Sequence, residues 1–227
     1  MKLASLYSGG KDSTYSLYKA MQAGHEVVVL ISMKSKNQAS YMFHIPNIDL
    51  VKLQAKALGI PLIFRGTEGV KEEELADLKA AIIEAKEKYK IEGVVSGAVA
   101  SEYQRQRIAK ICEELGLKSV CPLWHAEPEE YLSEFLAEGF EAIFTGVAAG
   151  GLTEKWLGRQ FDSAALQELK ELHQKFKIHI SGEGGEYETL VTNGPIFKKK
   201  IVIEKAETLW REDSGFYLVK KAKLVAK

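Results

Sequence analysis

A six-residue loop near the amino terminus, Ser8-Gly9-Gly10-Lys11-Asp12-Ser13, combines residue types that bind phosphate groups. Adjacent glycines adopt backbone angles that are closed to other residues and let anionic oxygens approach the main chain. The apolar spacing that begins at Asp12 predicts a helix directly after the loop, and the start of a helix offers free N–H groups and a positive dipole end. Ser8 and Ser13 add hydroxyl donors, and Lys11 can add charge. The loop is therefore predicted to hold the phosphates of a nucleotide.

A simple helix cap and a kinase-type phosphate loop both fit these residues less well. A tight turn in which Ser8 or Asp12 caps the helix needs a single polar side chain. The loop instead holds two adjacent glycines, two serines and an aspartate. The phosphate loop of kinases and GTPases has the form G-x-x-x-x-G-K-[ST], and neither its glycine spacing nor its final pair is present here.

The loop follows the first of several short apolar runs that alternate with longer helical patterns as far as Cys121. The expected strands are Leu3–Tyr7, Glu26–Met33, Pro61–Arg65, Gly93–Gly97 and Lys118–Cys121. The expected helices are Asp12–Ala23, Ile48–Leu58, Glu72–Lys90 and Ser101–Leu115. This alternation predicts βαβ units and an α/β fold with a doubly wound parallel sheet. In such sheets ligands bind at the carboxyl ends of the strands.

The regular pattern breaks around Pro122 and Pro128, where we place a domain boundary. Residues 1–124 form the expected nucleotide-binding domain, and residues 125–227 form a smaller α+β domain. Its expected elements are helices over Pro128–Glu138 and Asp162–Lys175, a strand over Glu141–Val147, and a terminal hairpin made by Lys200–Glu204 and Phe216–Val219.

The segment Gly182–Thr189 contains three glycines and three glutamates in eight residues. It is expected to form a flexible loop that binds a metal ion or a cationic group, because hard cations take oxygen ligands. A solvated acidic turn is the simpler alternative. In an extended segment, Glu186 and Glu188 would point to one side and Tyr187 to the other.

These residues carry a resemblance to a known superfamily. The loop at residues 8–13 matches the SGGxDS loop of the N-type ATP pyrophosphatases, also called PP-loop proteins. The resemblance implies a fold like that of the adenine nucleotide alpha hydrolases. It also implies cleavage of ATP to AMP and pyrophosphate, with Mg²⁺ accompanying the nucleotide.

Within this superfamily, the chain resembles the family of diphthine–ammonia ligases over nearly its whole length. The residues that carry this likeness are Met42–Asn47, Ser96–Val99, Tyr103–Arg105, Trp156–Arg159 with Asp162, and Gly182–Thr189. The resemblance implies that diphthine on elongation factor 2 is adenylated at its carboxylate, and that ammonia then displaces AMP to form an amide. Free ammonium is the expected nitrogen source, because no glutaminase domain fits in the remaining length.

The resemblance and the residue types together select the candidate site. The ATP-binding residues are Ser8, Gly9, Gly10, Lys11, Asp12, Ser13, Met33, Ser96 and Gly97, and the catalytic candidates are Lys11, Asp12, His44 and Glu186. The substrate-binding candidates are Tyr103, Gln104, Arg105, Trp156, Arg159, Glu183, Glu186, Tyr187 and Glu188. Aromatic faces bind quaternary ammonium groups, so the trimethylammonium of diphthine is expected beside Tyr103, Trp156 or Tyr187. The ligands of the metal ion stay unassigned.

Composition excludes several other classes of protein. The chain has 31 basic and 31 acidic residues, so no general polyanion-binding surface and no direct nucleic-acid binding are expected. The longest apolar run, Val27–Ile31, is too short to span a bilayer, and a cytoplasmic chain without membrane contact is expected. Two cysteines, Cys112 and Cys121, cannot form a four-thiolate zinc site and are expected to be packing residues. A homodimer stays open.

Two further functions stay open at this stage. One is another PP-loop enzyme that adenylates a tRNA or a small molecule, although thiolating members usually need paired cysteines that are absent here. The other is an ATP-binding sensor that does not hydrolyse the nucleotide. Steady release of pyrophosphate in the presence of substrate would exclude the sensor.

Overall fold

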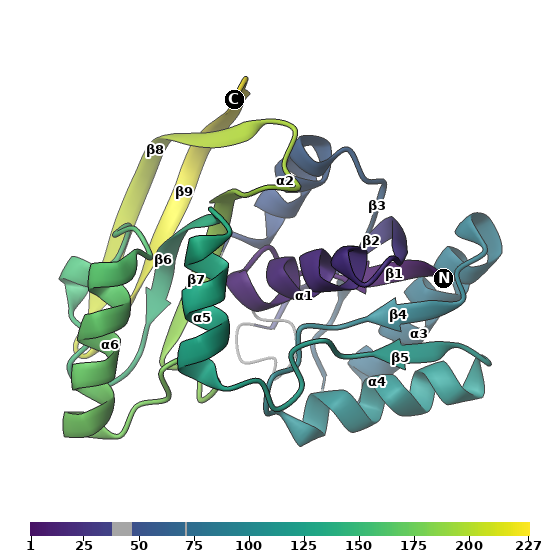
Figure 1. The fold of residues 1–227 in the computed structure, drawn as a ribbon, viewed down its shortest axis with the longest axis horizontal. Helices are drawn as coiled ribbons and strands as arrows, with labels where there is room; N and C mark the ends of the chain where they lie inside the picture. Colours follow the sequence, from purple (N-terminus) through teal and green to yellow (C-terminus); the bar gives the residue numbers. More distant parts are fainter. Residues whose placement is uncertain (38–46, 71) are drawn as a thin grey trace.

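The computed structural model describes residues 1–37, 47–70 and 72–227, in which helices flank two β-sheets (Figure 1). The first sheet has five parallel strands in the order β3-β2-β1-β4-β5. These strands are β1 (Lys2–Leu6), β2 (Glu26–Ser35), β3 (Leu62–Thr67), β4 (Gly93–Val95) and β5 (Lys118–Val120). The strand order reverses between β1 and β4, which is the place where open α/β sheets bind ligands.

Helices cover both faces of this sheet. They are α1 (Lys11–Gln22), α2 (Val51–Leu58) with a preceding 3₁₀ turn η1 (Ile48–Leu50), α3 (Glu73–Tyr89) and α4 (Glu102–Glu114). Along β1, Leu3 belongs to an apolar cluster with α1 and α2, whereas the next residue, Ala4, belongs to a cluster with α3 and α4. Successive side chains of a strand point to opposite faces, so α1 and α2 pack on one face and α3 and α4 on the other. The prediction of a doubly wound parallel sheet is confirmed.

The second sheet is antiparallel and has the strand order β7-β6-β9-β8. Its strands are β6 (Glu141–Val147), β7 (Tyr187–Asn193), β8 (Lys200–Arg211) and β9 (Ser214–Val225). The helices α5 (Pro128–Ala137) and α6 (Ser163–Phe176) lie over one face of this sheet, and a 3₁₀ turn η2 (Glu154–Trp156) follows β6 (Figure 1). This arrangement confirms a smaller α+β region in the second half of the chain.

One apolar cluster joins the two sheets. It contains Leu3 and Tyr15 from the first half of the chain together with Phe135, Phe144 and Val191 from the second half. The ring of Tyr15 packs edge-on against Phe135 with a centroid separation of 5.8 Å. A division after residue 124, which we keep as a proposal, therefore separates two sheets without separating two cores.

Two elements of the second half differ from the sequence expectation. The hairpin strands β8 and β9 have 12 residues each, longer than the two short runs expected. The segment from Tyr187 onward is strand β7, paired with β6 at Ile143↔Leu190, rather than a continuation of a flexible loop. Four consecutive residues of β7 are buried, so its period-two pattern is hidden in the sequence.

The two cysteines occupy different environments. Cys112 is buried in α4, and its packing role agrees with the expectation. Cys121 is partly exposed, and its Sγ lies 3.2 Å from Oγ of Ser96. Among the described helices, none combines the length and the apolar character that a membrane span requires.

Candidate active site

The loop at residues 8–13 joins the carboxyl end of β1 to α1 and folds back on itself. Gly9 has a φ of +82°, which only glycine adopts freely. The N–H of Ser8 donates to Oγ of Ser13 at 3.2 Å, and the N–H of Gly10 donates to Oγ of Ser8 at 3.3 Å. Gly10 is the N-cap of α1, and as a glycine it has no side chain with which to cap the helix. The loop is therefore not an ordinary turn capped by Ser8 or Asp12.

A cavity of about 440 Å³ lies in front of this loop, between the two sheets. The first half of the chain contributes Ser8, Gly10, Lys11, Asp12, Ser13, Met33, Ser96, Gly97 and Gln104 to its wall, among other residues. The second half contributes Gly182, Glu183, Gly184, Gly185, Tyr187, Glu188 and Thr189. The cavity thus brings the phosphate-loop candidates and most of the acidic segment to one place.

Gly97 lies against the phosphate loop itself. A Cβ atom added to Gly97 would lie only 2.8 Å from the backbone nitrogen of Ser13. The side chain of Ser96 is buried at the same edge of the sheet. Gly97 therefore permits the end of β4 to approach the first turn of α1, and both strand ends face the cavity.

The buried Lys11 and the partly exposed Asp12 form an ion pair at the junction of the two halves. The Nζ atom of Lys11 donates to Oδ2 of Asp12 at 2.9 Å and to the carbonyl oxygen of Ser181 at 2.6 Å. The same Nζ lies 5.0 Å from the centre of the Tyr187 ring. The other carboxylate oxygen of Asp12 accepts a hydrogen bond of 2.9 Å from the hydroxyl of Tyr131. The sequence pattern did not single out Tyr131, because a tyrosine in an amphipathic helix resembles any other core residue.

Two glutamates from the second half contribute carboxyl groups with raised pKa values to the cavity. Burial raises the pKa of Glu188 to about 7, with Asp12 and Glu183 acting in the same direction and Lys11 opposing them. Burial also raises the pKa of Glu183, and the negative charge of Asp12 raises it further. The N–H of Ala100 donates to Glu183 at 3.0 Å and thereby ties the acidic segment to the loop after β4. Three carboxyl groups around one ammonium group make this cavity attractive to a cation.

Glu186 is oriented differently from its neighbours. Its two carboxylate oxygens accept hydrogen bonds from the N–H groups of His179, at 2.7 Å, and Gly184, at 2.8 Å. Glu186 lies directly before β7. The expectation that Glu186 and Glu188 point to the same side of one strand therefore does not apply to Glu186. Glu188 lines the cavity, whereas Glu186 braces its own loop. A catalytic role for Glu186 stays a prediction.

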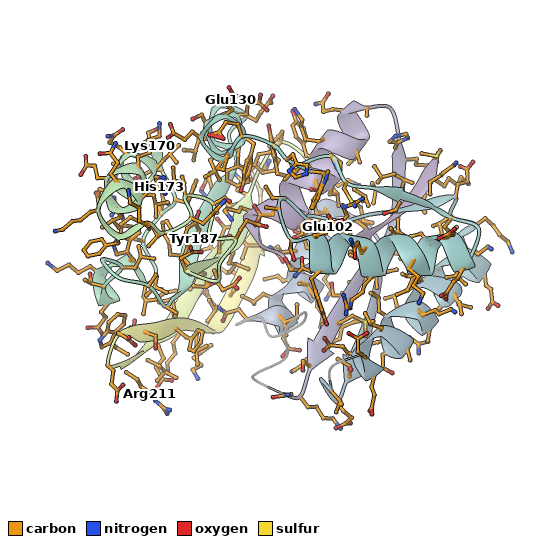
Figure 2. All side chains as sticks on the ribbon, turned by 90° about the horizontal axis from the view of Figure 1, so that it is seen from below. Glu102, Glu130, Lys170, His173, Tyr187 and Arg211 are labelled. Atoms are coloured by element: carbon orange, nitrogen blue, oxygen red, sulfur yellow. The ribbon has the colours of Figure 1, made fainter. Side chains whose placement is uncertain are left out.

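The aromatic candidates are spread over the molecule. Tyr187 lines the cavity but is only 3% exposed, and its hydroxyl donates to the carbonyl oxygen of Ile180. Trp156 is buried against Phe144, away from the cavity wall. In Figure 2, Tyr187 lies in the interior, among elements of the second half of the chain.

The polar candidates outside the acidic segment are also divided. Gln104 lines the cavity, while the hydroxyl of Tyr103 bonds to Glu72. Arg105 forms an ion pair with Glu102, which Figure 2 shows at the exposed first turn of α4. Arg159 stacks on Trp156 and forms an ion pair with Glu168. His44 lies outside the described residues.

Comparisons with known proteins support one family. A family model described as the diphthamide synthase N-terminal domain matches residues 1–119, and one described as the C-terminal domain matches residues 127–225. A diphthine–ammonia ligase of Danio rerio is 37% identical, with 95% of this chain and 91% of that protein covered.

Relatives from other organisms carry the same name. The Homo sapiens diphthine–ammonia ligase is 34% identical and covers 95% of this chain, with 88% of its own length matched. The Schizosaccharomyces pombe protein is 36% identical over 100% of this chain but only 40% of its own length. A solved structure from Methanocaldococcus jannaschii, described as a predicted subunit of tRNA methyltransferase, has 16% identity and a TM-score of 0.44 over 86% of this chain and 98% of that chain.

Proposed function

This chain belongs to the diphthamide synthase family, and we propose that it is an ATP-dependent ligase that converts diphthine on elongation factor 2 into diphthamide. The observation that carries the proposal is the cavity between the two sheets. The SGGKDS loop forms one wall of this cavity, and Glu183 and Glu188 form the other. A phosphate-binding loop thus faces a surface suited to a cationic acceptor.

The phosphate loop accounts for the first half of the reaction. The first turn of α1, with its N–H groups and the positive end of the helix dipole, suits the phosphates of ATP. We propose that Ser8, Ser13 and Lys11 hold the departing pyrophosphate while the acceptor carboxylate attacks the α-phosphorus. Positioning and charge neutralisation contribute most of the rate enhancement in such transfers.

The acidic wall accounts for the recognition of the acceptor. Diphthine carries a trimethylammonium group, and anionic or aromatic surfaces bind such groups. Of the three aromatic candidates, only Tyr187 lines the cavity, next to Glu188. We therefore propose that Glu183, Tyr187 and Glu188 receive the acceptor. Ammonia then attacks the acyl adenylate, AMP departs, and the amide forms. Because the acceptor is a translation factor, we place the reaction in the cytoplasm.

Mg²⁺ fits this cavity as a companion of the triphosphate. Within residues 1–37, 47–70 and 72–227, no group of three or more His, Cys, Asp or Glu side chains converges on a metal site. Mg²⁺ bound to a nucleotide needs only one or two carboxylates, because phosphate and water oxygens complete its shell. Asp12, which belongs to the phosphate loop, would hold the ion, and the bound ion would neutralise charge on the departing phosphates.

One experiment tests reaction and substrate together. The protein is incubated with labelled ATP, ammonium and elongation factor 2 that carries diphthine, and a parallel sample contains factor without the modification. We expect AMP, pyrophosphate and amidated factor only with the modified protein. Dominant ADP would overturn the proposal, and so would pyrophosphate release that is indifferent to the acceptor. Asp12→Ala serves as the control, in which turnover is expected to fall.

A further inference from the structure

Gln54 in α2 is fully buried, and its side chain reaches the phosphate loop. Its Nε2 atom donates to the carbonyl oxygen of Gly9 at 2.9 Å and to that of Val191 at 2.8 Å. Both partners are carbonyl oxygens, which only accept hydrogen bonds, so the amide can be oriented in only one way. One side chain thereby connects the phosphate loop to strand β7.

The backbone of β7 runs alongside the same loop. The N–H of Val191 donates to the carbonyl oxygen of Gly9 at 2.9 Å. The N–H of Lys11 donates to Oγ1 of Thr189 at 3.0 Å. The carbonyl of Gly9 therefore accepts two hydrogen bonds, from Gln54 of α2 and from Val191 of β7, and Thr189 of β7 adds a third contact with the loop.

The fit around Gly9 leaves no free space. A Cβ atom at Gly9 would lie 2.2 Å from Oε1 of Gln54. Among the described residues, this Oε1 has no hydrogen-bond partner although it is buried. An unpaired buried acceptor costs stability, about 1–3 kcal/mol for such a group. An apolar side chain would fill this part of the core without that cost. The amide is explained by its two donated hydrogen bonds, which clamp the phosphate loop to β7.

Gln54 has no direct access to the cavity. It is absent from the cavity wall, whereas its partner strand contributes Tyr187, Glu188 and Thr189 to that wall. We propose that Gln54 is a positioning residue that locks the ATP-binding loop to β7. The clamp holds Gly9 in its left-handed conformation and keeps the loop donors aligned with the phosphates. It also fixes the position of the ATP-binding loop relative to Tyr187, Glu188 and Thr189, which line the cavity from β7. This inference rests on the proposed function of the loop.

The test compares two variants of α2 that both remove buried groups. Gln54→Met keeps the length of the side chain but removes both donors. Val51→Ala is the matched control, because Val51 is 1% exposed in the same helix and makes no side-chain hydrogen bond. For both variants, the dissociation constant of MgATP is measured by calorimetry and the thermal midpoint by scanning calorimetry. We expect Gln54→Met to weaken MgATP binding about tenfold. Val51→Ala should change the MgATP dissociation constant by less than about twofold, although both variants lower the thermal midpoint by a similar amount.

A second variant addresses the case in which Gln54→Met fails to fold. Gln54→Glu keeps the shape, but its ionised carboxylate would face two carbonyl oxygens. Protonation restores one O–H donor, so its MgATP affinity should recover toward that of the native protein as pH falls. A merely structural role predicts no such recovery.

The outcomes separate this inference from the proposed function. A native protein that binds no MgATP overturns the function of the loop, and the inference falls with it. A native protein that binds MgATP, together with Gln54→Met of unchanged affinity, overturns the inference alone. Equal losses of affinity in Gln54→Met and Val51→Ala do the same.

Discussion

The hydroxyl of Tyr131 donates a hydrogen bond of 2.9 Å to Oδ1 of Asp12, although 119 positions separate the two residues. Burial raises the pKa of Tyr131 well above its usual range, and the neighbouring charge of Asp12 adds to the effect. The hydroxyl therefore stays protonated at neutral pH and remains a donor. Because Lys11 donates to the second oxygen, both oxygens of Asp12 are held in place.

Tyr131→Phe should therefore lower kcat/KM for AMP formation about tenfold, because a hydrogen bond to a charged group is lost. The matched control is Tyr18→Phe. It removes a tyrosine hydroxyl of α1 that donates to Glu138, the residue directly after α5, away from the cavity. We expect near-native kinetics for this control, and equal losses in both variants would contradict a role for Tyr131 in orienting Asp12.

The phosphate loop should respond to removal of its side chains. Asp12→Ala and Ser13→Ala are expected to weaken MgATP binding or turnover by roughly 1–3 kcal/mol, the scale of lost hydrogen bonds to charged groups. Ser16→Ala is the control for Ser13→Ala, because Ser16 is buried in the same helix and its hydroxyl has no partner among the described residues. Titration calorimetry measures all three. If Asp12→Ala and Ser13→Ala both leave affinity and turnover unchanged, the loop has no role in nucleotide binding.

The acidic wall should serve the acceptor more than the nucleotide. Glu188→Gln is expected to raise KM for the diphthine-bearing factor about tenfold, because a charge beside the trimethylammonium is lost. The MgATP dissociation constant should stay within about threefold. The exposed Glu207→Gln on β8 is the control and should change neither value. A large loss of MgATP affinity in Glu188→Gln would instead assign this carboxylate to the metal ion.

The pH dependence of the stability of the substrate-free protein should reveal the raised pKa of Glu188. Its pKa of about 7 lies above the ordinary value of 4.5, so the folded protein keeps a proton that the unfolded chain loses between these values. The free energy of unfolding of the native protein therefore falls as pH rises through this window. Glu188→Gln lacks this loss and should gain stability relative to the native protein between pH 5 and pH 8, by on the order of 2 kcal/mol.

Denaturant unfolding at a series of pH values measures this difference. Glu204→Gln gives the opposite contrast, because hydrogen bonds from Lys223 and Lys221 lower the pKa of Glu204. Its native carboxylate contributes stability that is present at high pH and lost as pH falls. Parallel stability curves for Glu188→Gln and the native protein would show that Glu188 has an ordinary pKa.

Asn47 connects the start of η1 to β9. Its Nδ2 donates to the carbonyl oxygen of Tyr217 at 2.9 Å, and its Oδ1 accepts from the N–H of Val219 at 2.8 Å. Asn47 has a φ of +65°, so Asn47→Gly keeps the backbone conformation and removes only the two hydrogen bonds. We expect a loss of about 1–2 kcal/mol in the free energy of unfolding. Lys90→Gly is the control, because Lys90 also has a positive φ, of +54°, and is exposed at the end of α3; an equal loss there would argue against a specific role of Asn47.

Local sequence was sufficient for the first half of the fold. The strands β1 to β5 and helices α1 to α4 lie within a few residues of their expected bounds, because apolar runs mark the strands, apolar periods mark the helices, and glycines follow α1, α2 and α4. The phosphate loop was equally readable, since its glycines, serines and lysine occur in one continuous stretch. A site made of consecutive residues is visible in a sequence, and the side of the sheet on which it lies follows from the strand direction.

Only the tertiary structure decided which distant residues complete this site. Tyr131 and Gln54 contact the phosphate loop from α5 and α2, and nothing in their local pattern distinguishes them from residues of an ordinary core. Thr189 ends the acidic segment Gly182–Thr189, but its contact with the phosphate loop is visible only in the structure. The structure likewise separated Glu188, which lines the cavity, from Glu186, which braces its own loop. Strand β7 was invisible in the sequence, because burial of both its faces erases the alternation that marks a strand. Chemistry carried by neighbouring residues is a property of the sequence, whereas the pKa and orientation of each group depend on chain segments that meet only after folding.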